Sequence, residues 1–348
     1  MEYGKIEGTR QMENRQREII GELIRRIDSG AYTEKLPSAR ELAAEFRVNI
    51  KTANKAVLKL AASGRVERKR RAGTRIRRGA ETAEPLIEVL FEGFASIFSH
   101  PFWNEIWHGI TEVLLAENFR PVLHMIEADP KTGILNLEQF TLTPSAGKIL
   151  LGIGEKRLFD LVAATGVPFI AGCDRINDPA IPQIAFDFRR GISDAVEYLH
   201  RNGVRKIAFI GRTHHYISLG YLHKFESYLA AIQRYSVIDP ALIGNAEPVP
   251  GSGAAAVRAI LAEGGRPEGV IAAYDHQLPE IVSELKEHGL TPPVIGCDGL
   301  PLEGVPPLRP EILAPRKKCG ELLARSLVDA IRRGGTPESR TLPAVFYQ

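Results

Sequence analysis

The first part of the chain carries apolar residues at helical spacing, separated by residues that end and begin helices. A first helix is predicted by the stripe of Ile19, Ile20, Leu23, Ile24 and Ile27. Gly30 follows where a glycine commonly ends a helix. Ser38, with Glu41 three positions later, has the pattern of a capping box and predicts the start of a second helix.

A third helix and two short strands complete this pattern. The third helix is predicted over residues 51–63, with Ala53, Ala56, Val57 and Leu60 facing inward. Two strands are expected near residues 65–68 and 74–77, joined by a basic turn. Three helices followed by a two-stranded hairpin predict a winged helix-turn-helix, which places its third helix in the major groove of DNA.

The pattern changes after a short segment without apolar periodicity, residues 79–85. From Leu86 onward, apolar runs of four to seven residues alternate with helical patterns. Repeated alternation of this kind predicts parallel sheets covered by helices, an α/β architecture. About 260 residues of it predict two lobes with a ligand site between them, beyond the carboxyl ends of the strands.

Length and composition agree with several domains and narrow the class of protein. The chain has 348 residues, of which 44% are hydrophobic and 25% charged, as in ordinary globular proteins. No apolar run approaches the roughly 18–20 residues of a membrane helix, and no secretory signal is recognisable. The cysteines, at 173, 297 and 319, form no CxxC pair. We therefore expect a reduced, cytoplasmic protein that contacts no membrane.

The net charge of +3 conceals two parts of opposite sign. Residues 1–80 hold 20 Lys and Arg against 10 Asp and Glu, whereas the remaining residues hold 25 against 32. A cationic module joined to an acidic body is typical of a protein that binds nucleic acid with one part only. A merely solvated basic face would explain the charge alone equally well.

The candidate DNA contacts lie on the third helix and in the hairpin. Lys51, Thr52, Asn54 and Lys55 are polar residues on the leading turn of that helix, able to reach base edges and phosphates. Eight basic residues and one acid occupy positions 64–78, among them Arg70 and Arg71 at the turn of the wing. The alternative, a small helical domain that contacts only protein, leaves this basic wing unexplained.

These residues resemble a known family. The octapeptide from Leu36 to Ala43, followed at the right separation by Gly73-Thr74, resembles the GntR-type winged-helix DNA-binding domain. The resemblance implies that Arg40 anchors a phosphate or base and that Gly73 brings the wing close to the minor groove. It also implies major-groove positions for Asn49, Lys51, Thr52 and Asn54. Asn49-Ile50 stands where the family usually has Ser-Arg, so the operator sequence does not follow from relatives.

In the body, four aspartates directly follow apolar strands. They are Asp174, Asp187, Asp275 and Asp298. Carboxylates at this edge of a sheet can accept hydrogen bonds from the hydroxyls of a sugar or nucleoside. Asp187 and Asp275 stand close before helices and could instead be N-caps.

The body also resembles a family, the effector-binding body of LacI/GalR-type repressors. The resemblance rests on the motif His100-Pro101-Phe102-Trp103-Asn104-Glu105-Ile106, on residues 199–211, and on residues 294–298. It implies the periplasmic-binding-protein type I fold and an interlobe ligand site near His100. Phe102 and Trp103 would form an aromatic wall there, and Asp174, Tyr274 and Asp298 would contact polar groups of the ligand. Packing of the two aromatic residues into the core is the alternative for them.

Three departures from this family are visible. Lys224-Phe225 replaces a Gly-aromatic pair, and Tyr221 replaces the arginine that grips ligand hydroxyls. Ala314 stands where a polar residue is often found, and no short hinge helix joins head to body. The changes at Tyr221 and Lys224-Phe225 and at Ala314 reduce hydrogen-bonding capacity, so the ligand can be unusual or the site degenerate.

The sequence thus predicts a ligand-responsive transcriptional regulator, acting as a repressor. As a homodimer it would bind a palindromic, double-stranded DNA operator and respond to a small-molecule effector that is sugar-like or nucleoside-like. The expected units are a head over 1–78, a linker over 79–85 and a body over 86–348. Lobe 1 is expected at about 86–187 and 309–335, and lobe 2 at about 188–308 and 336–348. One alternative is a DNA-binding regulator with a degenerate, non-sugar or ligand-free cleft.

An enzyme tethered to DNA by its head is the remote alternative. It would require a nucleophile, metal or cofactor motif, and we recognise none in the sequence. We therefore expect no catalytic residues, no metal and no cofactor.

Overall fold

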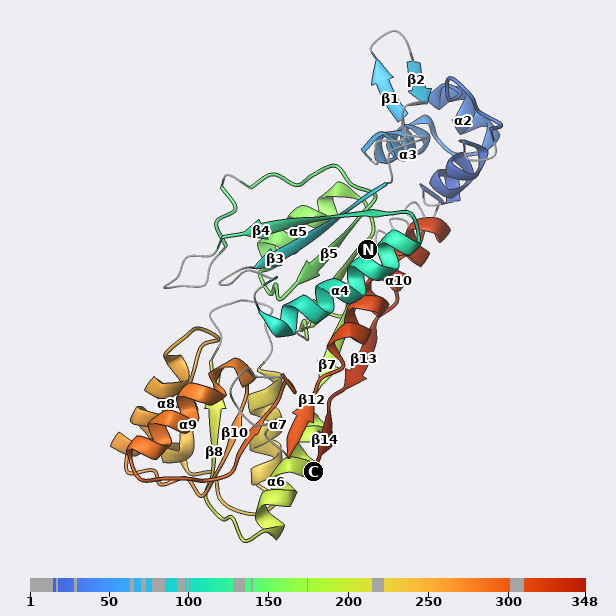
Figure 1. Ribbon diagram of the computed structural model, residues 1–348. Coiled ribbons are helices and arrows are strands. Elements are labelled where there is room, and N and C mark those ends of the chain that lie inside the picture. The colour runs from blue at the N-terminus through green and yellow to red at the C-terminus, as the bar shows by residue number, and fades with distance from the viewer. Residues whose placement is uncertain are drawn as a thin grey trace, which may run out of the picture.

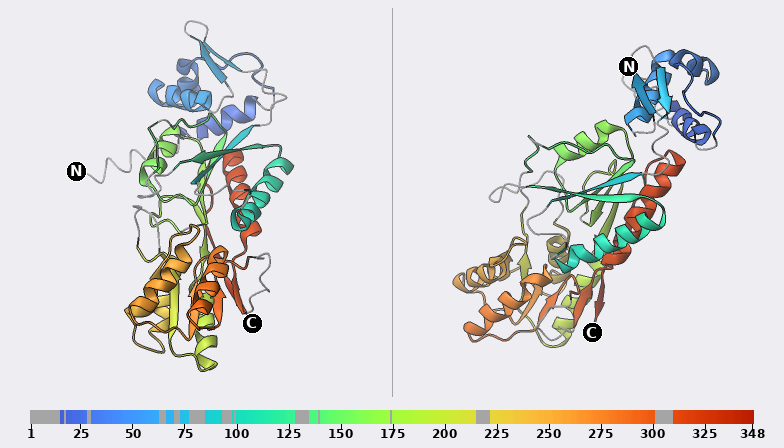
Figure 2. Two further views of the ribbon diagram at one scale, coloured as in Figure 1. Left: turned by 60° about the vertical axis from the view of Figure 1, so that its left-hand side comes forward. Right: turned by 45° about the horizontal axis from the view of Figure 1, so that its top comes forward.

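A computed structural model gives the architecture of the chain. It describes residues 15–16, 18–27, 30–62, 66–69, 73–76, 85–92, 98, 100–127, 135–138, 140–173, 175–214, 222–300 and 310–348. Figure 1 shows three units, a small helical head and two α/β lobes, and Figure 2 shows the same units from two other sides.

The head has the predicted winged-helix plan. Helical residues 18–27 precede α2 (Ala39–Glu45) and α3 (Ile50–Ala62), and the wing consists of antiparallel β1 (Val66–Lys69) and β2 (Gly73–Ile76). The capping box of α2 is present, because the Ser38 hydroxyl accepts from the Glu41 N–H and the Glu41 carboxylate accepts from the Ser38 N–H. Gly30 has the positive φ of 75° that suits the end of the preceding helix.

The core of the head unites its three helices with the wing. It consists of Ile19, Leu23, Leu36, Leu42, Ala43, Ala53, Ala56, Val57, Leu60 and Val66. The wing is also hydrogen-bonded to the segment before α2, through Leu36 N to Thr74 O at 2.9 Å and Ile76 N to Glu34 O at 2.9 Å. The wing is therefore held in a fixed position beside α3.

Lobe 1 is built on a six-stranded parallel sheet of order β13-β7-β6-β5-β3-β4. The strands are β3 (Leu86–Glu92), β4 (Arg120–Ile126), β5 (Gly147–Leu151), β6 (Phe169–Cys173), β7 (Gln183–Asp187) and β13 (Arg340–Pro343). Helices α4 (Pro101–Ala116) and α10 (Arg316–Arg333) cover one face, and α5 (Lys156–Thr165) covers the other. Strands buried on both faces explain the continuous apolar runs of the sequence.

Lobe 2 has a four-stranded parallel sheet of order β11-β10-β8-β9. The strands are β8 (Ile207–Gly211), β9 (Ile243–Asn245), β10 (Gly269–Ala272) and β11 (Val294–Gly296). The helices are α6 (Arg189–Arg201), α7 (His223–Ile232), α8 (Ser252–Ala262) and α9 (Leu278–Glu287), with the short 3₁₀ helices η1 (Pro240–Leu242) and η2 (Asp275–Gln277). An antiparallel pair, β12 (Glu311–Leu313) and β14 (Val345–Tyr347), packs on α6 beside this sheet.

The chain crosses between the lobes three times, and this corrects the boundaries expected from sequence. It leaves lobe 1 after β7, returns between β12 and α10, and leaves again between β13 and β14. The sequence places segment 311–313 in lobe 1, but it lies with lobe 2, and it places 340–343 in lobe 2, but that segment pairs with β7. Strands of three or four residues have too little periodicity to identify their partner.

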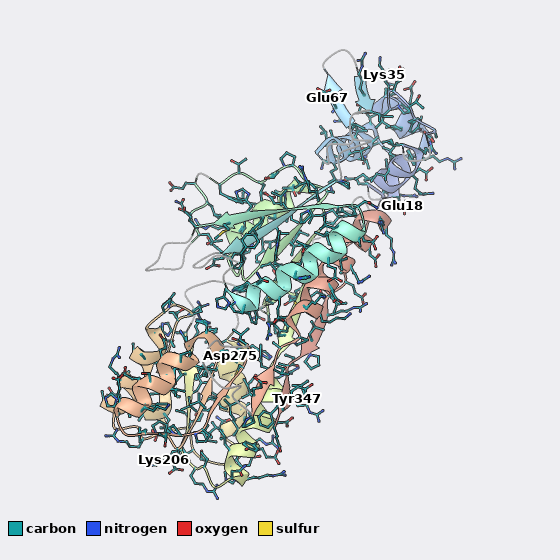
Figure 3. The ribbon with its side chains drawn as sticks, viewed as in Figure 1. Glu18, Lys35, Glu67, Lys206, Asp275 and Tyr347 are labelled. Carbon is teal, nitrogen blue, oxygen red and sulfur yellow. The ribbon has the colours of Figure 1, made fainter. Side chains whose placement is uncertain are left out.

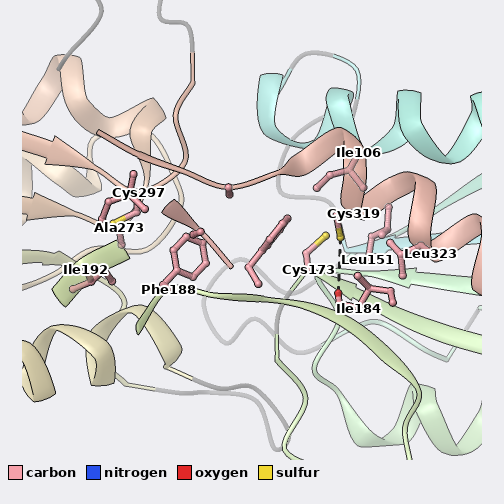
Figure 4. Packing of buried hydrophobic residues seen from close by; sticks show 14 of the residues in the cluster. Ile106, Leu151, Cys173, Ile184, Phe188, Ile192, Ala273, Cys297, Cys319 and Leu323 are labelled. Atoms are coloured by element: carbon pink, nitrogen blue, oxygen red, sulfur yellow. Dashed lines mark hydrogen bonds between the residues drawn. The ribbon is translucent and has the colours of Figure 1, made fainter. Parts of the chain in front are cut away.

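The two lobes share one apolar cluster at these crossings. Figure 4 shows it running from Ile192, Ala273 and Cys297 on one side to Leu151, Ile184 and Leu323 on the other. Phe188, directly after β7, lies between the two groups. The lobes therefore share a packed hydrophobic core where the chain crosses between them.

Candidate functional site

The reading surface of the head begins at Asn49, the residue before α3. Its side-chain oxygen accepts hydrogen bonds from the Thr52 backbone N–H at 2.7 Å and from the Thr52 hydroxyl at 3.0 Å. Asn49 thus caps the helix in the N-cap manner. The sequence predicts that Thr52 faces the major groove, but it is only 5% exposed, because its hydroxyl turns back to Asn49.

The other candidate DNA residues are distributed over the same surface. Arg40, Asn49, Lys51 and Lys55 are exposed, and Asn54 is half-buried. Gly73 has a φ of 83°, and a side chain added there would meet open space, as the turn of a protruding wing requires. Arg70 and Arg71 lie outside the described residues. Cationic side chains beside a helix N-terminus suit contact with phosphates.

We define the interlobe site as His100, Lys224, Tyr274, His276 and Asp298. Its centre is a buried ion pair in which Lys224 Nζ lies 2.7 Å from Asp298 Oδ1. The ammonium also donates to Ala273 O at 2.5 Å and lies 4.5 Å from the centre of the Phe188 ring. Burial is the largest single influence and lowers the pKa of Lys224, but the charge and hydrogen bond of Asp298, with smaller effects of Cys297 and Tyr274, together raise it above its ordinary value, so Lys224 remains a cation.

Asp275 supports Asp298 from behind rather than capping a helix. The Asp275 carboxylate accepts from the backbone N–H groups of Asp298 at 2.9 Å and Leu300 at 2.8 Å, while Asp298 accepts from the Asp275 N–H at 3.1 Å. Burial and the neighbouring Asp298 charge raise the pKa of Asp275 to about 7. Figure 3 shows Asp275 at the side of lobe 2 that faces lobe 1.

The aromatic residues predicted for the wall of the site lie in the first turn of α4. Phe102 and Trp103 are half-buried, with ring centres 5.0 Å from each other, and Trp103 lies 5.0 Å from Phe91. Both pack against the apolar cluster shared by the lobes. Trp103 also covers Gly152, where an added side chain would come within 3.0 Å of its ring. Phe102 and Trp103 therefore pack against the core, which was the alternative to a ligand-binding role for these two residues.

His100 precedes α4 and reaches lobe 2. Its Nε2 lies 3.2 Å from Nδ1 of His276 in η2. Burial lowers the pKa of His100, and burial together with His100 lowers the pKa of His276 to about 4. Both rings are neutral near pH 7.

A second polar contact crosses the lobes at Arg316, the first residue of α10. Its side chain is 7% exposed, and the guanidinium donates to the carbonyl oxygens of Asp298 and Gly299 and, at 2.8 Å, to the Glu105 carboxylate. The roles of His276, Lys224 and Arg316 do not follow from the sequence. Lys224 stands out in the sequence only as a departure from the family pattern, and His276 and Arg316 are not singled out there.

Two predicted ligand residues, Asp174 and Tyr221, lie outside the described residues. The residue before Asp174 is nevertheless informative. Cys173 ends β6 with a φ of 83°, a conformation that is costly for a residue other than glycine. Such strain often lies beside functional groups.

The described part of the chain contains neither a recognisable metal site nor a membrane-spanning helix. No three His, Cys, Asp or Glu side chains there come together as a metal site. No helix there is long and apolar enough to cross a bilayer.

Comparison with known families identifies both parts of the chain. Residues 15–76 match bacterial regulatory proteins of the gntR family, and residues 196–346 match a periplasmic binding protein-like domain. The chain therefore joins a GntR-type DNA-binding domain to a periplasmic-binding-protein-like body, as the sequence predicted. A search of curated proteins found no significant match.

Solved structures agree with this architecture. A complex of the transcriptional regulator CelR with cellobiose is 21% identical with a TM-score of 0.66, covering 90% of this chain and 99% of that one. A LacI family regulator from Enterococcus faecium with bound ribose is 21% identical with a TM-score of 0.61, covering 76% and 97%. The lac repressor dimer bound to operator and the anti-inducer ONPF is 19% identical with a TM-score of 0.62, covering 78% and 95%. At these identities the likeness concerns the fold.

Proposed function

We propose that this chain, a GntR-type head on a periplasmic-binding-protein-like body, is a transcriptional repressor controlled by a small effector. As a homodimer it would bind a palindromic operator with two winged-helix heads. The effector, a sugar or sugar-like molecule, would bind between the lobes. The observation that carries the proposal is the interlobe site, where polar groups of both lobes converge at the carboxyl ends of strands, on a chain that also bears a basic reading head.

The chemistry of the site suits a neutral, hydroxyl-bearing effector. Asp298 supplies an acceptor, the Lys224 ammonium a donor, and Tyr274 an aromatic face 5.2 Å from that ammonium. Sugars combine hydroxyl groups with apolar ring faces, and such a mixture of charged and aromatic residues can bind both. Structural neighbours bound to cellobiose and ribose support this class of effector.

The signal would pass as a shift between lobe arrangements. An effector that binds the closed arrangement more tightly than the open one changes their ratio and, with it, the placement of the heads. Since 79–85 is the only connection between head and body in the sequence, the signal would act by restricting where the heads can lie.

Binding experiments test the two halves separately. A random duplex library selected with the full chain should yield a two-fold symmetric site, and binding should weaken steeply with salt. Thermal denaturation should then be followed with a panel of monosaccharides, disaccharides and nucleosides, where a bound effector raises the melting temperature. Asp298→Asn should abolish that shift, whereas substitution of the exposed Asp329 should leave it unchanged. Operator affinity unaffected by a bound effector would contradict the proposal.

One observation favours a second candidate, a regulator with a ligand-free site. Lys224 already satisfies Asp298 and Ala273 O, the groups that a ligand would otherwise use. Under this alternative the whole panel gives no thermal shift while operator selection still succeeds.

A further inference from the structure

His100 and His276 make a direct contact between the lobes. Their ring centres lie 4.9 Å apart with the planes at 74°, and the facing nitrogens are 3.2 Å apart. His100 belongs to lobe 1 and His276 to lobe 2, so the contact exists only while the lobes are together. The Arg316 contact, by comparison, lies directly beside a crossing of the chain.

The outer nitrogens of the pair are buried without compensation. His100 Nδ1 and His276 Nε2 have no hydrogen-bond partner among the described residues. With both rings neutral, either His100 Nε2–H donates to His276 Nδ1 or His276 Nδ1–H donates to His100 Nε2, so the bridge needs no extra proton. A proton added to either ring would place a charge and an unpaired N–H in a buried position, which is costly. Two protonated rings would also turn N–H groups toward each other.

We propose that His100 and His276 form an interlobe latch, a pair of positioning residues that holds the lobes closed while both rings are neutral. Opening exposes both rings to water. A histidine in water takes up a proton more readily than one buried in the closed arrangement. Acidification therefore shifts the body toward the open arrangement. The latch rests on the proposed function only in that lobe closure is what would carry the effector signal.

Other titratable and charged groups lie around the two histidines and have to be considered in any pH experiment. They are Asp275 in η2, Asp298 after β11, Lys224 on α7, Glu280 on α9, and the Glu105–Arg316 pair from α4 and α10, with Tyr274 beside His276. Asp275 titrates near neutral pH, but its partners Asp298 and Leu300 belong to lobe 2, as it does. A variant that removes the His276 titration alone separates the two effects.

Small-angle X-ray scattering on the full chain, without DNA or effector, measures opening as a larger radius of gyration. The pKa of His276 is about 4 in the closed arrangement and would be an ordinary 6.5 when open. Protonation of His276 on acidification from pH 7.5 to pH 5.5 therefore lowers the ratio of closed to open molecules about tenfold. We expect the radius of gyration to rise over this interval in the wild-type chain.

Substitutions distinguish the latch from general acid expansion. His276→Asn keeps a hydrogen-bonding atom near the position of Nδ1 but cannot titrate, so its response to pH should be much smaller. His100→Gln, which imitates Nε2, serves as the second variant if the first fails to fold. His276→Ala should be more open at both pH values. His108→Gln, on the exposed side of α4, should follow the wild type.

A radius of gyration independent of pH in the wild-type chain, or an equal rise in wild type and His276→Asn, would overturn the latch. Either result would leave the regulator proposal intact, because operator selection and the effector panel test that separately. If both of those tests fail but the radius of gyration still rises on acidification, the latch stands as a property of the fold and the regulator proposal does not.

Discussion

At the scale of single residues, the buried cation of Lys224 determines the character of the interlobe site. The Lys224 side chain is 17% exposed and that of its partner Asp298 is 4% exposed, so both charges are largely removed from water. Such a pair contributes little net stability, but breaking it leaves one charge buried and unpaired. The site is therefore sensitive to loss of either member alone.

Lys224→Met removes the cation and leaves the Asp298 carboxylate without its partner. We expect the free energy of unfolding of the body to fall by about 3 kcal/mol, and the double variant Lys224→Met/Asp298→Asn to regain most of this loss. Differential scanning calorimetry of the full chain measures both. Lys318→Met, at a side chain 57% exposed, should change stability by less than about 0.5 kcal/mol. Equal destabilisation in the single and double variants would contradict the argument.

Asp275 provides a pH-dependent prediction of its own. Its pKa is raised from 3.8 to about 7, so the folded body binds this proton more tightly than the unfolded chain does. Its contribution to stability is therefore greatest at acidic pH and is lost as the pH rises through 7. The melting temperature, compared between wild type and Asp275→Asn from pH 5.5 to 8.5, should show this decline in the wild type only. A decline of the same size in Asp275→Asn would assign it to another group.

At the scale of elements, the closest packing in lobe 1 is between α4 and α10. The two helices lie side by side in Figure 1 and in both views of Figure 2. A methyl group added at Gly109 would overlap the Lys317 carbonyl oxygen, and one at Gly320 would overlap that of Ile106. Both glycines are therefore required by the close approach of two backbones.

Gly320→Ala should force these helices apart, because the overlapping atoms are backbone and have no rotamer to change. We expect a loss of about 1–3 kcal/mol in the free energy of unfolding, measured by calorimetry. Gly335→Ala is the matched control, since an added methyl group there meets nothing within 4 Å and the backbone is not left-handed. A stability of Gly320→Ala equal to that of the control would show that the helices can separate without cost.

Some elements of this fold follow from the sequence, and others do not. The capping box at Ser38, the helix of residues 50–62 and the alternation of strands and helices were predictable, because each depends on local spacing. The exchange of β12 and β13 between the lobes was not, because three or four residues do not determine a partner. The role of His276 was not predictable either, since its partner is a residue 176 positions away.

At the scale of the whole molecule, the division of charge separates the two binding tasks. The basic head attracts a polyanion, whereas the acidic body is repelled by it, which suits the proposed division of DNA binding and effector binding between the two. The exposed Lys51 and Lys55 stand on the leading turns of α3, whereas Thr52 between them is buried. Exposure of the side chain, and not its position along the helix, therefore predicts which of these three contributes to DNA binding.

Lys51→Ala and Lys55→Ala should each weaken binding of the full chain to a duplex without a specific site, because each removes a cation near the phosphates. Removal of one lysine that binds a phosphate should reduce the slope of log affinity against log salt by about 1. Thr52→Val keeps the shape of a buried side chain and should leave that slope unchanged, although loss of its hydrogen bond to Asn49 lowers thermal stability.

Lys286→Ala on α9 of lobe 2 controls for net charge. Fluorescence anisotropy from about 50 to 300 mM salt gives the slopes. An equal reduction of the slope in Lys286→Ala would show that overall charge, and not the surface of α3, directs the chain to DNA.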